Sequence, residues 1–246
     1  MTEWARSQLP RTIRSRFSVV GVTSEETDAA GKVHRRAPLF FLSYAHSAWQ
    51  RAQGAQPEPN QRIAEFFDDL SENVAQLVAK PPGADPGFMD RSIPGGSRWT
   101  PELLEAVGTC QVFVALLSDP YVSSEWCGKE WYAFSQRIVT SRAGDGIGHQ
   151  TGIIPVIWTP VPDTRLPKAV RDVQRFSPRG LPDVNIPARY GTDGIFGLKN
   201  IGLDTFYQSV VWRLAQRIAE FHFGYVVEPR VIRERELRDI FREKPQ

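Results

Sequence analysis

Short apolar runs are spaced along the chain and predict the strands of a buried sheet. Residues 38–44 (PLFFLSY) and 110–117 (CQVFVALL) are almost continuously apolar, as in strands covered on both faces. Shorter runs at 87–89 and 153–158 predict two more strands. Strands buried on both faces are typical of parallel sheets, so the pattern favours a parallel sheet over an antiparallel one.

The apolar residues between these runs return at helical spacing. A first helix is expected after residue 60 and ends before Pro81. A second is expected to start at Thr100, because a hydroxyl cap followed by Pro101 is a typical helix start. The apolar stripe of the first helix consists of Ile63, Phe66, Phe67, Leu70, Val74, Leu77 and Val78.

Two later segments also predict amphipathic helices. Ser123 or Ser124 caps one of them. The other lies close to the end of the chain, after a proline-rich loop region that runs from Pro160 to about Asn200. The residues expected to be buried are Cys127, Trp131, Phe134 and Ile138 in the first of these helices, and Phe206, Val210, Val211, Leu214, Ile218 and Phe221 in the second.

The alternation of strands and helices predicts an α/β fold of the flavodoxin-like kind, with a parallel sheet and helices on both faces. Residues 1–37 are expected to form a poorly ordered N-terminal arm, and residues 38–225 the α/β domain. Residues 226–246 form a charged tail, whose Arg and Glu spacing favours an exposed helical extension. Ligands of such sheets bind beyond the carboxyl ends of the strands, where Ser43 and Arg91 fall.

Composition and charge argue against several functions. A net charge of +2 gives no general electrostatic reason to bind nucleic acid. No apolar stretch approaches the roughly 20 residues that span a bilayer. Two cysteines cannot form a disulfide framework, and neither they nor the scattered histidines have the spacing of a metal site. We therefore expect a cytoplasmic protein that binds neither nucleic acid nor membrane and holds no metal.

Three motifs resemble those of TIR domains. Residues 41–44 (FLSY) resemble the first conserved sequence motif, or box, of TIR domains. The second strand and the BB loop after it are similar to residues 88–90 (FMD) and 93–96 (IPGG). The S-x-x-C-x-x-E pattern, on the helix that carries the catalytic glutamate, resembles residues 123–130 (SSEWCGKE). The resemblance covers residues 38–160. Within the family, the chain is similar to bacterial TIR-like proteins that are encoded beside FxSxx-COOH peptides.

This resemblance implies a NAD glycohydrolase or cyclase that releases nicotinamide in bacterial signalling or defence, with NAD as substrate and no separate cofactor. Glu130 is the implied catalytic carboxylate. Nicotinamide departs as a neutral molecule, so a single carboxylate suffices to stabilise the sugar cation. Trp99 is expected to stack on the pyridinium ring by cation–π attraction. The other residues that the resemblance places around the substrate are Ser43, Tyr44, Arg91, Cys127 and Trp126.

Other interpretations of the same residues stay open. Glu130 can instead be a boundary glutamate paired with Lys129 or Arg137, and Trp99 can pack on its own helix. The whole chain can be a non-catalytic TIR module that assembles with other TIR domains or with copies of itself. A third option is an accessory factor of a peptide-modification cluster. The interaction loop of an assembly module is expected to consist of Ile93, Pro94, Gly95 and Gly96.

Overall fold

The computed structural model describes six stretches of the chain. They are residues 37–46, 60–80, 84–90, 100–144, 150–181 and 183–242. Residues 1–36 of the predicted N-terminal arm lie outside them, and so does the strand-end loop of residues 91–99.

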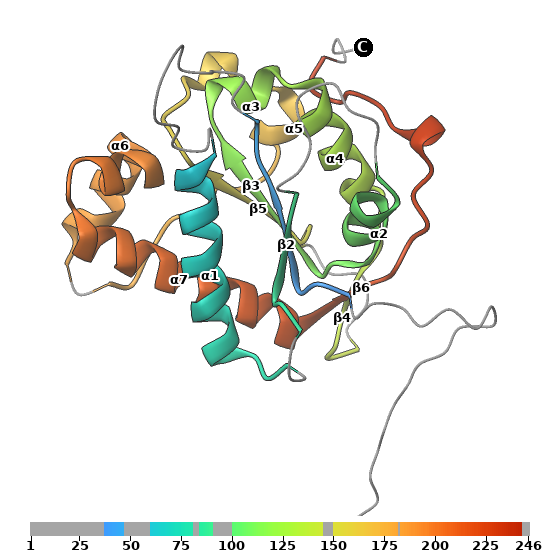
Figure 1. Ribbon diagram of the computed structural model, residues 1–246, viewed down its shortest axis with the longest axis horizontal. Coiled ribbons are helices and arrows are strands. Elements are labelled where there is room, and N and C mark those ends of the chain that lie inside the picture. Colours follow the sequence, from blue (N-terminus) through green and yellow to red (C-terminus); the bar gives the residue numbers. More distant parts are fainter. Residues whose placement is uncertain are drawn as a thin grey trace, which may run out of the picture. The chain divides into compact units, whose positions relative to one another are not determined.

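Four parallel strands form the central sheet (Figure 1). They are β1 (Phe40–Ser43), β2 (Gly87–Met89), β3 (Val112–Leu117) and β5 (Ile153–Ile157), in the order β2-β1-β3-β5. Leu42 of β1 lies opposite residues of both its neighbours, so β1 is a central strand. Every residue of β1 and β3 is buried, as their unbroken apolar runs predict.

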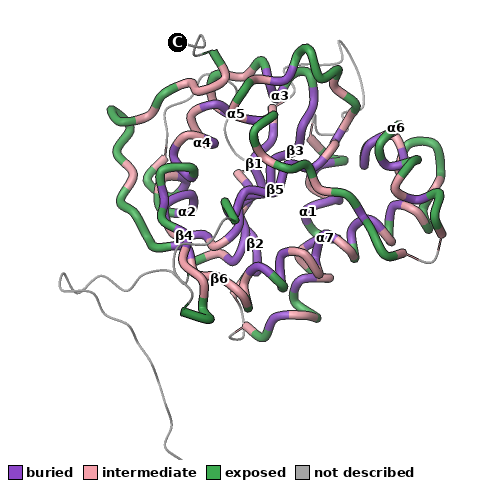
Figure 2. Tube along the Cα trace, turned by 180° about the vertical axis from the view of Figure 1, so that it is seen from behind, coloured by how far each residue is buried: buried purple, intermediate pink, exposed green. Residues whose placement is uncertain are grey.

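Helices cover both faces of this sheet (Figures 1 and 2). On one face α1 (Gln61–Leu77) packs against α7 (Asp204–Gly224), and on the other α2 (Pro101–Thr109) packs against α4 (Glu125–Ser135). The α/β class, the parallel sheet and the helices on both faces are therefore confirmed. The buried residues of α1 all belong to its predicted stripe: Ile63, Phe66, Phe67, Leu70 and Val74.

Three hydroxyl side chains fix where helices begin. Thr100 Oγ1 accepts a hydrogen bond from the backbone N–H three residues later at 3.2 Å, and Ser124 Oγ caps α4 in the same way at 3.3 Å. These are the caps that the sequence predicts. Ser118 Oγ starts a further short helix, α3 (Asp119–Ser123), which the sequence analysis does not anticipate. Each cap satisfies a backbone donor that the helix itself leaves without an acceptor.

The region after β5 is more helical than predicted. It contains a 3-10 turn, η1 (Asp163–Arg165), and the helices α5 (Lys168–Arg171) and α6 (Asn185–Asn200). The prediction of loop up to Asn200 is wrong for α6, because its proline and glycines are typical helix breakers. α6 bends at Gly194, whose φ of 65° brings its Cα so close to Trp158 that an added Cβ would lie 2.5 Å from the carbonyl oxygen there.

The chain beyond α7 leaves the helical layer. β4 (Val139–Ser141) pairs antiparallel with β6 (Tyr225–Val227) in a separate two-stranded sheet. Residues 228–242, here called the C-terminal segment, then contain a single 3-10 turn, η2 (Glu234–Glu236), and no α-helix, so the predicted helical extension is wrong. Ile138 lies between α4 and β4 with 53% of its surface exposed, so its predicted burial in the helix is also wrong.

A buried arginine fastens the C-terminal segment to the domain. The Arg137 guanidinium donates to the carbonyl oxygens of Val107 at 3.1 Å and Cys110 at 2.6 Å. It also donates to the carbonyl oxygens of Val227 at 3.3 Å and Glu228 at 3.1 Å. Arg137 is only 7% exposed, and this burial lowers the pKa of its guanidinium group. One side chain thus joins the end of α2, the start of β3 and the strand β6.

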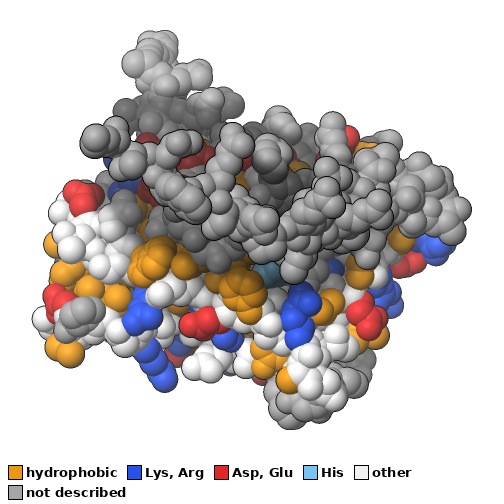
Figure 3. Space-filling view, turned by 90° about the horizontal axis from the view of Figure 1, so that it is seen from below, with side chains coloured by type: hydrophobic (Ala, Val, Ile, Leu, Met, Phe, Trp, Pro, Cys, Tyr) orange, Lys and Arg blue, Asp and Glu red, His pale blue; other side chains and the backbone are white. Residues whose placement is uncertain are grey.

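Charged side chains of both signs are scattered over the described part of the face shown in Figure 3. This agrees with the near-zero net charge of the chain. None of the helices in the described stretches is long and apolar enough to cross a membrane.

Candidate functional site

Glu130 extends from α4 toward the carboxyl end of β1. Ser43, the last residue of β1, donates a hydrogen bond from its hydroxyl to Glu130 Oε2 at 2.5 Å. Ser43 is only 1% exposed, whereas Glu130 is partly accessible. Ser43 therefore holds the carboxyl group at the end of β1, on the side of the sheet where ligands of parallel sheets bind.

A second hydroxyl lies behind Ser43. The Tyr121 hydroxyl is 3.0 Å from Ser43 Oγ, and both side chains are buried. Burial raises the pKa of Tyr121 well above its ordinary value, so the phenol keeps its proton. Since Ser43 has one hydrogen and directs it to Glu130, Tyr121 donates to Ser43. Two hydroxyl groups in series thus point their donors toward one carboxylate, which strengthens both bonds.

Burial raises the pKa of Glu130 to about 8. The hydrogen bond from Ser43 acts in the opposite direction by favouring the ionised form, and the nearby charge of Asp90 adds to the rise. Near neutral pH the carboxyl group is therefore largely protonated. A cationic ligand would favour ionisation, so this carboxyl group is suited to bind a positive charge and release a proton as it does so.

The neighbouring strand-end residues are ordered around Glu130. Tyr44 donates from its hydroxyl to the carbonyl oxygen of Asp90 at 2.5 Å, which ties the end of β1 to the end of β2. The ring of His46 lies 4.5 Å from that of Tyr44, and its Nδ1 is 3.5 Å from the Asn60 side-chain nitrogen. Burial lowers the pKa of His46, although Asp90 partly opposes this. His46 is therefore an aromatic neighbour of Tyr44 at the edge of the site.

The two basic residues considered as partners of Glu130 are engaged elsewhere. Lys129 forms an ion pair with Glu125 at 2.6 Å. Arg137 donates to four backbone carbonyl oxygens at the other end of α4. Neither neutralises Glu130, so its raised pKa is not offset by either cation.

A family model described as TIR domain matches residues 69–183. This match identifies a TIR domain in the chain. The matched residues run from α1 to beyond α5 and include Tyr121 and Glu130, whereas Ser43 precedes them. No curated protein and no solved structure matches the chain.

In this TIR domain, the predicted site residues fall into three groups. Ser43 and Tyr44 lie at the strand ends beside Glu130, but both are buried, so they orient the site from below. Trp126 is partly exposed on α4, one helical turn before Glu130, with Lys129 Nζ 5.5 Å from the centre of its ring. The third group consists of predicted site residues that lie outside the described stretches: Arg91, Ile93, Pro94, Gly95, Gly96 and Trp99.

Cys127 does not fit its predicted role. It is 1% exposed and faces the core from the buried side of α4, so it cannot touch a substrate at the surface of the site. Burial, together with the nearby charge of Glu130, raises the pKa of this thiol well above its ordinary value. Cys127 therefore remains a neutral thiol beneath the site, where it fills the core.

Two aromatic residues behind the site were not predicted from the sequence. Tyr121 lies just before the motif of residues 123–130 and was not expected to reach Ser43. Phe241 of the C-terminal segment lies 5.7 Å from the ring of Tyr121 and 5.8 Å from that of Trp131. A Cβ added to Gly128 would lie 2.1 Å from a carboxylate oxygen of Asp239, so glycine lets this segment approach α4. No local signal links residue 241 to the site, because the contact depends on the path of the whole chain.

Proposed function

We propose that this TIR domain cleaves the bond between nicotinamide and ribose in NAD. The observation that carries the proposal is the desolvated carboxyl group of Glu130, a partly exposed residue of α4, which Ser43 holds at the end of β1. Membership of the TIR family supports the same reaction class, because the family includes enzymes that cleave NAD. The product is free nicotinamide together with ADP-ribose or a cyclic form of it.

The proposed chemistry needs one carboxylate. As the bond between the anomeric carbon and the pyridinium nitrogen breaks, its electron pair leaves with neutral nicotinamide. The ribose becomes an oxocarbenium-like cation, and the ionised Glu130 stabilises that charge in a site from which part of the water is excluded. In hydrolysis water then attacks the anomeric carbon and loses a proton to solvent. We further propose that Trp99 stacks on the nicotinamide ring as it departs.

The pH profile of nicotinamide release tests the role of Glu130. The ionised carboxylate is the active form, and its pKa in the free protein is about 8. We therefore expect kcat/KM to rise as the pH increases toward that value and to level off above it. Measurement of nicotinamide release by the purified protein across this range gives the profile. A flat profile, or one that falls with increasing pH, contradicts the proposal.

The hydroxyl groups of Ser43 and Tyr121, here called the hydroxyl pair, set the midpoint of that pH profile. Ser43→Ala removes a donor that favours the ionised form of Glu130, so we expect the midpoint of the kcat/KM profile to move upward by about one pH unit. Tyr121→Phe should move it in the same direction by less, because Ser43 keeps its bond to Glu130. Ser135→Ala is the control, since this exposed hydroxyl on α4 donates only to a backbone carbonyl oxygen. An unchanged midpoint in Ser43→Ala shows that the hydroxyl pair does not control the ionisation.

A second candidate function is assembly without catalysis. It is favoured by the family, whose members commonly bind other TIR domains, and by the residues Ile93 and Pro94 in the BB loop motif. Under this proposal Pro94→His abolishes self-association or partner binding, and Glu130→Gln leaves both intact. Light scattering of the two variants over a range of concentrations separates assembly from catalysis. Loss of association in Glu130→Gln alone would contradict this candidate function.

A further inference from the structure

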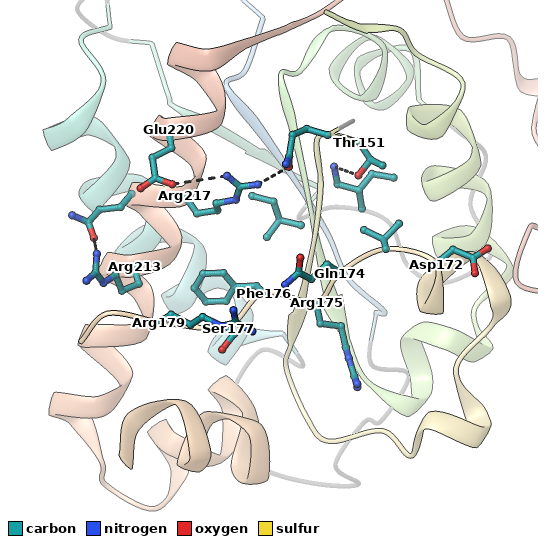
Figure 4. Close-up of a pocket in the computed structure, with 15 residues that line it drawn as sticks. Thr151, Asp172, Gln174, Arg175, Phe176, Ser177, Arg179, Arg213, Arg217 and Glu220 are labelled. Carbon is teal, nitrogen blue, oxygen red and sulfur yellow. Dashed lines mark hydrogen bonds and ion pairs between the residues drawn. The ribbon is translucent and has the colours of Figure 1, made fainter. Parts of the chain in front are cut away.

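A separate cavity lies on the outer side of β5. It has a volume of about 530 Å³ and is bordered by β5, the stretch of chain after α5 and α7 (Figure 4). β5 is the last strand of the described sheet, and beyond it the backbone N–H of Phe176 donates to the carbonyl oxygen of Pro155 at 2.8 Å. Neither Glu130 nor the two hydroxyl residues behind it line this cavity.

Four arginines line the cavity, in a chain whose net charge is only +2. They are Arg175, Arg179, Arg213 and Arg217, and Figure 4 shows that they come from both walls. Two carboxylates also line it. One of them, Asp172, is already paired with Lys168 at 2.6 Å, so it does little to neutralise the arginines.

Two of these four guanidinium groups are held by neutral partners. Arg213 donates to the Gln216 side-chain oxygen at 2.9 Å and to the carbonyl oxygen of Gly180. Arg217 donates to the Gln150 side-chain oxygen at 2.7 Å, and its carboxylate neighbour Glu220 is 3.9 Å away. Neutral acceptors fix the direction of a guanidinium group without cancelling its charge.

The other two arginines of the cavity are Arg175 and Arg179. Arg175 is paired with Asp163 at 3.0 Å, outside the cavity lining. The Arg179 guanidinium has no ion-pair or hydrogen-bond partner among the residues that the structure describes. The cavity therefore holds an excess of positive charge that its own carboxylates do not balance, in a concave space where such charge attracts anions.

We propose that this cavity binds a nucleoside diphosphate or a close analogue of it. Guanidinium groups bind phosphate oxygens in pairs of parallel hydrogen bonds, and arginines on two walls suit two adjacent phosphates. The volume lies in the range of small-molecule sites. Ile153, Ile154 and the partly buried ring of Phe176 supply an apolar surface for a base. The proposal is independent of NAD cleavage, since no residue of the Glu130 site takes part.

Calorimetric titration of the full chain with ADP and with adenosine tests this site. ADP is expected to bind and adenosine is not, because the phosphates supply the attraction. Arg179→Ala and Arg217→Ala should each weaken ADP binding by about tenfold. Arg179→Ala removes a side chain that has no hydrogen-bond or ion-pair partner among the described residues, so it leaves the fold intact.

Two controls complete the titration. Arg171→Ala removes an exposed arginine of α5 that does not line the cavity, and it should leave ADP binding unchanged. Glu130→Gln should also leave it unchanged, which separates this cavity from the proposed NAD site. The proposal is overturned if ADP does not bind, if adenosine binds as tightly, or if Arg171→Ala weakens binding as much as the two cavity variants do. Loss of ADP binding in Glu130→Gln alone overturns it as well.

Discussion

Glu130→Gln is expected to raise the free energy of unfolding by about 4 to 5 kcal/mol at about pH 9 and by less than about 1 kcal/mol at about pH 5. The pKa of Glu130 is about 8 in the folded protein, against an ordinary value of 4.5. Between these values the folded state holds a proton that the unfolded state has lost. Stability therefore falls as the pH rises through this window. Glutamine resembles the protonated acid in shape and polarity, and it avoids this loss.

Urea unfolding of wild type and variant at the two pH values measures this difference. Glu125→Gln is the matched control, because Glu125 lies on the same helix, is exposed and is paired with Lys129. Removal of that surface pair should change the free energy of unfolding little at either pH. If Glu130→Gln is no more stable than wild type at the higher pH, the carboxyl group of Glu130 is not desolvated in the folded protein.

Arg137→Met is expected to lower the free energy of unfolding by about 3 kcal/mol or more. Arg137 donates to four backbone carbonyl oxygens, which no substitution can remove. Methionine keeps most of the apolar stem but leaves those carbonyl groups buried without their donor. Two of the four carbonyl groups belong to Val227 and Glu228, where the C-terminal segment begins. This segment is therefore expected to loosen first.

Thermal unfolding compares Arg137→Met with Arg142→Ala. Arg142 also donates to a backbone carbonyl oxygen, that of His222, but it does so at the surface, so its loss should cost less than about 1 kcal/mol. Hydrogen exchange of the backbone around residues 228–242 should increase in Arg137→Met and stay unchanged in the control. Equal stability of the two variants would contradict the role assigned to the buried guanidinium.

Local signals were enough to predict the central sheet and most of its helices. The buried strands β1 and β3 appear as unbroken apolar runs, and α1 as a single apolar stripe. Thr100 and Ser124 act as the expected caps because capping depends on only a few neighbouring residues. The TIR domain that the short motifs predict is confirmed by the family-model match to residues 69–183.

Segments whose conformation depends on distant contacts were not predicted. α6 contains proline and glycines that are unfavourable in isolation, and packing decides its structure. The charge pattern of the C-terminal segment suggests a solvated helix, yet its backbone is held by Arg137 and its end by the ring of Tyr121. Contacts between residues 90 or more positions apart leave no periodic trace in the sequence.

The candidate site depends both on features that the sequence predicts and on contacts that it does not. The positions of Ser43 and Glu130 beside the sheet follow from topology, because the carboxyl ends of parallel strands share one edge. The hydrogen bond between them, the support from Tyr121 and the raised pKa of Glu130 depend on packing that the sequence does not display. Such a desolvated carboxyl group costs stability, and proteins retain groups of this kind most often at functional sites.

Nicotinamide release from NAD by wild type and Glu130→Gln, at high protein concentration and at about pH 9, tests the central claim most directly. We predict release by wild type and by the control Glu125→Gln, and a decrease of about a hundredfold to a thousandfold in Glu130→Gln. Equal release by wild type and Glu130→Gln would contradict the account, because the carboxylate would then have no part in breaking the bond.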